Sequence, residues 1–166
     1  MQPVPSPAKT PRPVEYAGFW RRFVAWIIDA ILISMVSFIV IIPILAVVGI
    51  GIGVGAAADE PEAAAGLIMA AIGAYFFAIF VLEVAGWLYF AIMESSEKMG
   101  TLGKIAMGII VTDTEGRRIT FGRATGRYFA KILSGMIFAI GYIMAGFTQR
   151  KQALHDILAS CLVVMK

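Results

Sequence analysis

Two very long apolar stretches constrain this chain more than any other feature. Residues 23–58 contain a single charged side chain, Asp29, and residues 63–93 contain a single charged side chain, Glu83. A helix needs about 20 apolar residues to cross roughly 30 Å of hydrocarbon, so each stretch is long enough to span a bilayer. Both are too long for the short apolar core of a cleaved signal peptide. The sequence therefore predicts at least two permanent membrane spans.

The composition supports a membrane protein of mostly helical structure. Of 166 residues, 60% are hydrophobic and 15% are charged, and the mean hydropathy is +0.85, which lies outside the range of ordinary soluble domains. We expect an all-α integral membrane protein with two long transmembrane helices, a third membrane-embedded or interfacial helix, and a small cytoplasmic β-hairpin. The main partner is then the lipid bilayer, and we expect no nucleic acid.

The chain divides into a short tail and one membrane domain. Residues 1–15 are rich in proline and poor in apolar side chains, which predicts a flexible tail. Residues 16–166 form the membrane domain. We expect its first span over about 20–48 and its second over about 64–93. Because proline breaks a helical hydrogen bond and four glycines follow Pro43, we expect a looser exit after residue 48. An acidic run at 59–62 predicts a short solvent loop.

The composition changes sharply after residue 93. Alternating apolar residues interrupted by an Asp-Thr-Glu-Gly turn predict a β-hairpin over about 108–122. A third helix is expected over about 124–147, followed by a carboxyl-terminal segment over 148–166. If this third helix crosses fully, the last segment lies on the opposite side. If it dips or lies flat, the strand-like residues 161–165 stay on the first side and can pair with residues 109–111, and we favour this alternative.

Basic residues predict the orientation in the membrane. They are frequent in the tail and in residues 94–131, whereas the loop at 59–62 has none. Cytoplasmic loops carry an excess of Lys and Arg. The amino terminus and the hairpin are therefore expected in the cytoplasm, with the chain crossing the plasma membrane more than once.

Six short motifs occur in a fixed order along the membrane domain. They are residues 18–29 (GFWRRFVAWIID), 94–96 (ESS), 100–104 (GTLGK), 108–113 (GIIVTD), 121–124 (FGRA) and 152–159 (QALHDILA). Together they resemble the RDD family of membrane proteins over nearly everything from Tyr16 to the end. The family's arginine and two aspartates match Arg22, Asp29 and Asp156, with Arg21 as the alternative arginine. The resemblance implies the cation/proton antiport activity that is attributed to some members.

Helical geometry favours Arg22 over Arg21 as the arginine that acts with Asp29. Seven residues place Arg22 about 20° from the face of Asp29 and roughly 10 Å away along the axis. Side chains on a helix lean toward its amino terminus, so Arg22 leans away from Asp29. A direct salt bridge between them is therefore not expected.

Asp29 lies two or three turns inside the first apolar stretch. A bare carboxylate there costs at least about 2.5–3.5 kcal/mol, so it needs a partner or a proton. The available charge partners are four basic side chains of the later half, namely Arg123, Arg127, Lys131 and His155. Asp29 then either clamps the first helix to that half or forms an ion or proton site.

Glu83 lies near the middle of the second stretch, where an ionisable residue is a functional candidate. Together with Asp29 it could form a two-carboxylate site for one cation or one shared proton. A protonated Glu83 that only hydrogen-bonds across an oligomer interface is an equal alternative.

The sequence shows no set of residues for catalysis or metal binding. Cys161 is the only cysteine and His155 the only histidine, so we expect no disulfide, no metal site, no cofactor and no enzyme activity. Two function classes follow. The first is exchange of monovalent cations and protons by buried carboxylates of a homo-oligomer. The alternative is a non-transporting membrane scaffold or accessory subunit.

Overall fold

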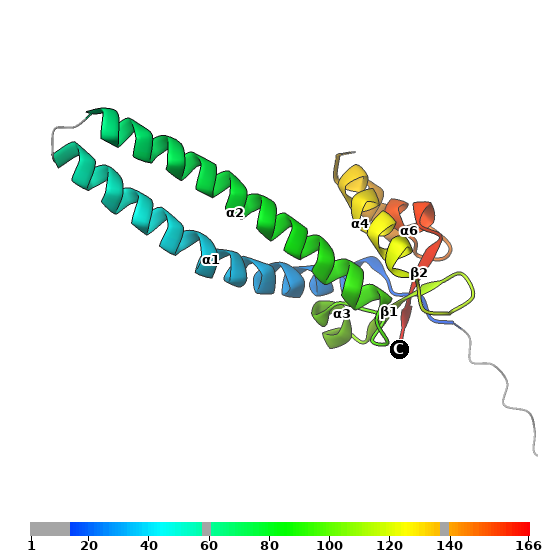
Figure 1. Ribbon diagram of the computed structural model, residues 1–166. Coiled ribbons are helices and arrows are strands. Elements are labelled where there is room, and N and C mark those ends of the chain that lie inside the picture. Colours follow the sequence, from blue (N-terminus) through cyan, green and yellow to red (C-terminus); the bar gives the residue numbers. More distant parts are fainter. Residues whose placement is uncertain (1–13, 58–60, 137–139) are drawn as a thin grey trace, which may run out of the picture.

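A computed structural model describes residues 14–57, 61–136 and 140–166. Most of the predicted tail at 1–15, residue 58 with residues 59–60 of the predicted acidic loop, and residues 137–139 of the predicted third helix lie outside the described residues. Two long helices, α1 (Phe19–Ala57) and α2 (Pro61–Ser95), run side by side and project from a small cap (Figure 1). The cap contains α3 (Leu102–Ala106), β1 (Ile109–Asp113), α4 (Phe121–Met136), α5 (Ile140–Ile143), the 3₁₀ turn η1 (Met144–Gly146), α6 (Leu154–Leu158) and β2 (Cys161–Met165).

The two long helices are the two predicted membrane spans. The apolar stretches Phe19–Gly55 and Glu62–Ser95 have mean hydropathies of 3.0 and 2.4 over their most apolar windows, and almost none of those windows is buried. At 1.5 Å per residue, the 39 residues of α1 reach about 58 Å, which exceeds the hydrocarbon thickness. The exposed apolar side chains of both helices therefore suit lipid, and the prediction of two long transmembrane helices is confirmed.

The first helix does not loosen after residue 48, so that expectation is wrong. Helix α1 contains Pro43 and continues through the glycines to Ala57. Lipid offers no partner for a freed backbone group, so a helix in lipid keeps its hydrogen bonds where the same sequence in water would fray. One of these glycines also has a packing role: a Cβ on Gly55 would lie 3.3 Å from the Cα of Ala64, where α2 approaches α1.

The two strands of the cap join distant parts of the sequence. Strand β1 pairs antiparallel with β2, with Ile109 opposite Met165 and Asp113 opposite Cys161, which confirms the predicted pairing of residues 161–165. The predicted turn after β1 is present, and its return arm touches β1 at one bridge between Thr112 and Arg118. On the other edge of β2, residues 15–17 add backbone hydrogen bonds. The start of α1, the end of α2 and the chain's last strand are therefore at the same end of the long helices.

The third apolar segment is bent and does not carry the chain across. Helix α4 and the α5–η1 segment differ in direction by 116°. They pack closely, since a Cβ on Gly141 would lie 2.8 Å from the Cβ of Ser134. A single crossing would take β2 to the side opposite β1, and the pairing of the two strands excludes this. The segment therefore dips or lies flat, which was the favoured alternative.

Helix α3 packs unusually close to α1. A Cβ on Gly103 would lie 2.0 Å from the carbonyl oxygen of Ala25 and 2.9 Å from Cγ of Asp29. No side chain fits in that space, because the nearest atom belongs to the backbone of a long helix. The glycine therefore sets the distance between α1 and the cap.

We predict that Gly103→Ala lowers the free energy of unfolding by at least about 1–3 kcal/mol, because the added methyl group forces α3 away from α1. Gly126→Ala in α4 is the control, since a Cβ at Gly126 meets nothing within 4 Å and alanine favours a helix by up to about 1 kcal/mol. The measurement is unfolding in detergent micelles. Equal stability of the two variants would contradict the assigned packing.

Candidate functional site

Asp29 is buried between the two spans and the start of α3. Its Oδ1 accepts hydrogen bonds from the Tyr89 hydroxyl and the Gly103 amide, both at 2.8 Å, and its Oδ2 accepts one from the Thr101 hydroxyl at 2.5 Å. The Tyr89 hydroxyl in turn accepts the Leu102 amide at 3.0 Å. Three neutral donors thus bind both oxygens of this buried side chain without a counter-ion. Asp29 thus ties α1 to α2 and to α3.

The expected basic partners of Asp29 are wrong. Within the described residues Asp29 makes no ion pair. The physical reason is the close approach allowed by Gly103, which brings the Thr101 hydroxyl and the Gly103 amide to Asp29, so its oxygens are occupied by groups of the 101–103 turn.

Glu94, at the end of α2, is one of two carboxylates that organise the basic side chains of the cap. Its Oε1 lies 2.5 Å from Nζ of Lys104 and 3.5 Å from Nζ of Lys131, and its Oε2 lies 2.6 Å from Nη1 of Arg127. Only 1% of Glu94 is exposed. One carboxylate therefore joins α2 to α3 and α4.

Asp156, the last of the family-matched residues, is the second carboxylate. Its Oδ1 lies 2.7 Å from Nη2 of Arg127, and its Oδ2 pairs with Nη1 of Arg22 and accepts the Ala153 amide at 3.1 Å. Arg127 therefore bridges Asp156 and Glu94. We call the six residues Arg22, Glu94, Lys104, Arg127, Lys131 and Asp156 the charge cluster.

Arg22 extends the charge cluster to the amino terminus of α1. Its Nε donates to the carbonyl oxygen of Ala17 at 2.9 Å, and its Nη2 donates to the carbonyl oxygen of Lys151 at 2.6 Å. The neighbouring Arg21 is exposed, and among the described residues its side chain hydrogen-bonds only to the sulfur of Met165, at 3.5 Å. Of the two candidate arginines, Arg22 is the one that lies in the cluster, and it faces Asp156 and not Asp29.

Burial and neighbouring charge shift the pKa values of the cap residues. Burial alone would raise the pKa of Asp156, but Arg127 and Arg22 outweigh it and hold that pKa well below its usual value. Burial, aided by the charge of Arg127, lowers the pKa of Lys104 to about 7 despite the contact with Glu94. The cluster holds four basic side chains against two carboxylates, which explains why one ammonium group is easily neutralised.

His155 is buried beside the charge cluster as a neutral ring. Its Nε2 lies 3.5 Å from Oδ1 of Asp156 and its Nδ1 lies 3.3 Å from Oγ of Ser134. Burial lowers its pKa to about 3, and the positive charge of Arg127 acts in the same direction. No group of three or more metal-ligating side chains occurs in the part of the chain that the structure describes.

Two of the sequence candidates lie outside this cluster. Arg123 is exposed, and its amide caps α4 by bonding to Oγ1 of Thr120. Glu83 is exposed on α2 and has no hydrogen bond or ion pair among the described residues. It precedes Tyr89, the α2 partner of Asp29, by six residues, or about 9 Å along the axis. The chain therefore does not bring Asp29 and Glu83 into one two-carboxylate site.

Five important residues were not singled out from the sequence. They are Tyr89, Glu94, Thr101, Gly103 and Lys104. Four of them lie in the motifs at 94–96 and 100–104, directly after the second span, where charges and small residues interrupt the apolar pattern. That abrupt change of composition was the available signal. Tyr89 gave none, because a tyrosine near a span end is ordinary in membrane helices.

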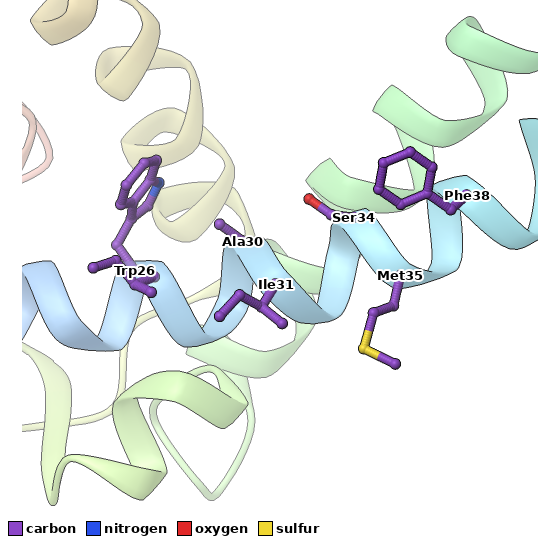
Figure 2. Close-up of a pocket in the computed structure, with 7 residues that line it drawn as sticks. Trp26, Ala30, Ile31, Ser34, Met35 and Phe38 are labelled. Carbon is purple, nitrogen blue, oxygen red and sulfur yellow. The ribbon is translucent and has the colours of Figure 1, made fainter.

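A shallow groove of about 380 Å³ lies on α1, away from the charge cluster. Its walls are Trp26, Ile27, Ala30, Ile31, Ser34, Met35 and Phe38. Figure 2 shows the small side chains of Ala30 and Ser34 between the rings of Trp26 and Phe38. Most of these side chains are exposed, so the groove opens to the surroundings of the helix.

We predict that Asp156→Asn lowers the free energy of unfolding by about 3–5 kcal/mol, because Arg22 loses its carboxylate partner and Arg127 keeps only Glu94. Glu97→Gln is the control, since Glu97 is exposed and its change should stay within about 0.5 kcal/mol. Denaturant titration in micelles measures both. A loss in Asp156→Asn no larger than that of the control would show that the cluster does not stabilise the fold.

We predict that stability falls as the pH drops below about 6.5, toward the folded pKa of His155 at about 3. In this window the unfolded chain binds a proton that folded His155 does not bind, because burial and, secondly, the positive charge of Arg127 lower the pKa of its ring. The loss reaches at most about 1.4 kcal/mol per pH unit. Unfolding measured between about pH 7 and pH 5 should show this slope, and His155→Gln should flatten it. An unchanged slope in His155→Gln would contradict the assignment.

Sequence comparisons relate the chain to known proteins. The chain is 39% identical over 152 residues to the uncharacterized protein YxaI of Bacillus subtilis (strain 168), covering 90% of this chain and 97% of that protein. It is 30% identical over 155 residues to the uncharacterized membrane protein YteJ of the same organism, covering 90% and 80%. No solved structure gives a significant match. The RDD family model matches residues 16–160, and the chain therefore belongs to the RDD family of membrane proteins.

Proposed function

We propose that this RDD family protein is a non-transporting membrane scaffold or accessory subunit. Its family-matched residues then act as a clamp that fixes the two spans to the cap. The observation that carries this proposal is that Asp29 and Asp156 are both almost fully buried and fully bonded inside the chain. Each of their four carboxylate oxygens already accepts at least one hydrogen bond.

Ion exchange at these carboxylates would require their present partners to leave. A cation at Asp156 has to displace Arg22 or Arg127, and arginine–carboxylate pairs are among the strongest hydrogen-bonded contacts in proteins. Removing one partner of a buried pair costs about 3–5 kcal/mol. A cation at Asp29 has to displace two hydroxyl groups and an amide that also position α3. Both sites suit a permanent contact better than a site that exchanges with water.

Glu83 supports a homo-oligomer as the working form. It is exposed within a span, and a carboxylate that faces lipid costs at least about 2.5–3.5 kcal/mol. Contact with a second copy would remove that cost. The basic residues at the cap end support a cytoplasmic cap and amino terminus in a cell membrane. We expect no enzyme activity and no cofactor in this role.

Glu83 also favours a second candidate function, which is exchange of monovalent cations and protons through an oligomer. Within the described residues of the spans, Glu62 and Glu83 are the carboxylates without a bonded partner in the chain; Glu62 lies in the first turn of α2, whereas Glu83 lies inside the apolar stretch. A ring of Glu83 carboxylates around an oligomer axis could take up protons or cations. This candidate does not use Asp29 or Asp156 as ion ligands.

Flux measurements separate the two functions. In vesicles with an imposed pH gradient, the scaffold proposal expects no Na⁺- or K⁺-dependent proton movement by the wild-type protein beyond that of protein-free vesicles. Cation-dependent movement that Glu83→Gln abolishes and Glu97→Gln keeps would overturn the scaffold proposal and support exchange.

The assembled mass in mild detergent tests the oligomer. We expect the wild type and Glu83→Gln to form the same multiple of the 17.9 kDa chain, because glutamine keeps the hydrogen-bonding capacity of the side chain. Glu83→Ala should shift the population toward the monomer. A monomeric wild type, measured by light scattering with correction for bound detergent, would contradict the homo-oligomer.

A further inference from the structure

Aromatic rings form a continuous ladder on the first turns of α1. The ring centroids of Trp20 and Phe23 are 6.1 Å apart, and those of Phe23 and Trp26 are 6.0 Å apart. Trp20 is 72% exposed and Trp26 is 57% exposed. Exposed tryptophans at the end of a span are typical of the membrane interface. This aromatic ladder, Trp20, Phe23 and Trp26, therefore marks the depth at which lipid headgroups meet α1.

The groove on α1 begins where the aromatic ladder ends. It extends from Trp26 to Phe38 (Figure 2), which is twelve residues or about 18 Å along the axis. One leaflet contributes about half of the roughly 30 Å hydrocarbon core. A groove that starts at the interface and has this length matches one acyl chain of the same leaflet. Its floor of Ala30 and Ser34 leaves room that a straight row of large side chains would fill.

Three basic residues lie at the interfacial end of the ladder, and we call Arg21, Arg150 and Lys151 the basic rim. All three are exposed, and none makes an ion pair among the described residues. The Lys151 ammonium lies 3.9 Å from the position of a Cβ on Gly18, directly before α1. Arg22 holds the carbonyl of Lys151 at 2.6 Å, so the buried charge cluster keeps this loop against the helix.

We propose that an anionic phospholipid binds at this place, with its phosphate group on the basic rim and one acyl chain in the groove of α1. The positive charge of the basic rim complements the anionic headgroup. The aromatic ladder places the headgroup at the membrane interface, and the groove has room for one acyl chain. A second copy fits less well. A two-fold contact between parallel α1 helices would bring two basic rims together, and like charges repel.

Quenching of tryptophan fluorescence by brominated lipid tests the proposal. Trp20→Phe and Trp87→Phe leave Trp26 as the only tryptophan of the chain. This protein is placed in vesicles of equal parts phosphatidylcholine and phosphatidylglycerol, with bromine on the acyl chains of one lipid at a time. We expect stronger quenching by the brominated phosphatidylglycerol, with a preference of about fivefold for each basic residue that engages the phosphate. Equal quenching by both lipids overturns the proposal. The absence of quenching by both lipids also overturns it, because a second copy would then cover the groove.

Two triple variants separate a defined site from general attraction. Arg21→Gln, Arg150→Gln and Lys151→Gln should together abolish the preference for the anionic lipid. Lys98→Gln, Arg118→Gln and Arg123→Gln remove the same charge from other exposed positions of the cap and should keep the preference. Equal loss in both triple variants overturns the proposal.

Native mass spectrometry of the chain with all its tryptophans gives a second measurement. Released from mixed micelles, it should retain bound phosphatidylglycerol in preference to phosphatidylcholine, and the variant of the basic rim should not. Retention of neither lipid by the unaltered chain counts against the site, even if the single-tryptophan protein does not fold.

Discussion

The bridge that Arg127 forms between Glu94 and Asp156 is the interaction on which the rest of the structure depends. Each end of its guanidinium group binds one carboxylate, at 2.6 Å and 2.7 Å, and only 2% of Arg127 is exposed. A buried carboxylate without a partner is costly, so Glu94 at the end of α2 and Asp156 in α6 have to meet this arginine together. Arg22 binds the other oxygen of Asp156 and brings in α1. One line of alternating charges thus fixes both spans, α4 and α6 relative to one another.

Polar contacts are decisive here because the apolar core of the cap is small. Among the described residues, its buried members are four alanines, four β-branched residues and Cys161, and small cores stabilise a fold only marginally. Helix α1 is held at two levels. Arg22 binds the carboxyl-terminal part of the chain, and Asp29, about 10 Å further along the axis, binds the 101–103 turn. Two attachments to different segments fix both the rotation and the tilt of α1, which one contact could not.

The sequence predicted the spans and the strand-like segments, because these depend on local patterns. The pairing of β1 with β2 followed from the preferred topology, in which the third apolar segment does not cross the membrane. The sequence did not predict the partners of Asp29, because these depend on how closely two backbones approach, and that distance is set by the missing side chain of Gly103. The charge cluster joins Arg22 to Asp156, and these two residues are 134 positions apart in the sequence. Periodicity carries no information about such pairs. The expected fraying after Pro43 failed for a different reason, since it applied a rule for helices in water to a helix in lipid.

The charge balance of the cluster also limits how deep it can lie. Four basic side chains face two carboxylates, so the cluster cannot be neutral by internal pairing alone. In hydrocarbon such an excess would be prohibitive, whereas at the headgroup boundary water and lipid phosphates can compensate it. Lys131 keeps 19% of its side chain exposed and Lys104 keeps 10%, which gives both ammonium groups a route to that boundary. The cluster therefore lies at the edge of the bilayer, and the two spans enter hydrocarbon only beyond it. Asp29 lies further along α1 and therefore deeper. No basic side chain of the cluster binds Asp29, and neutral hydrogen-bond donors take their place.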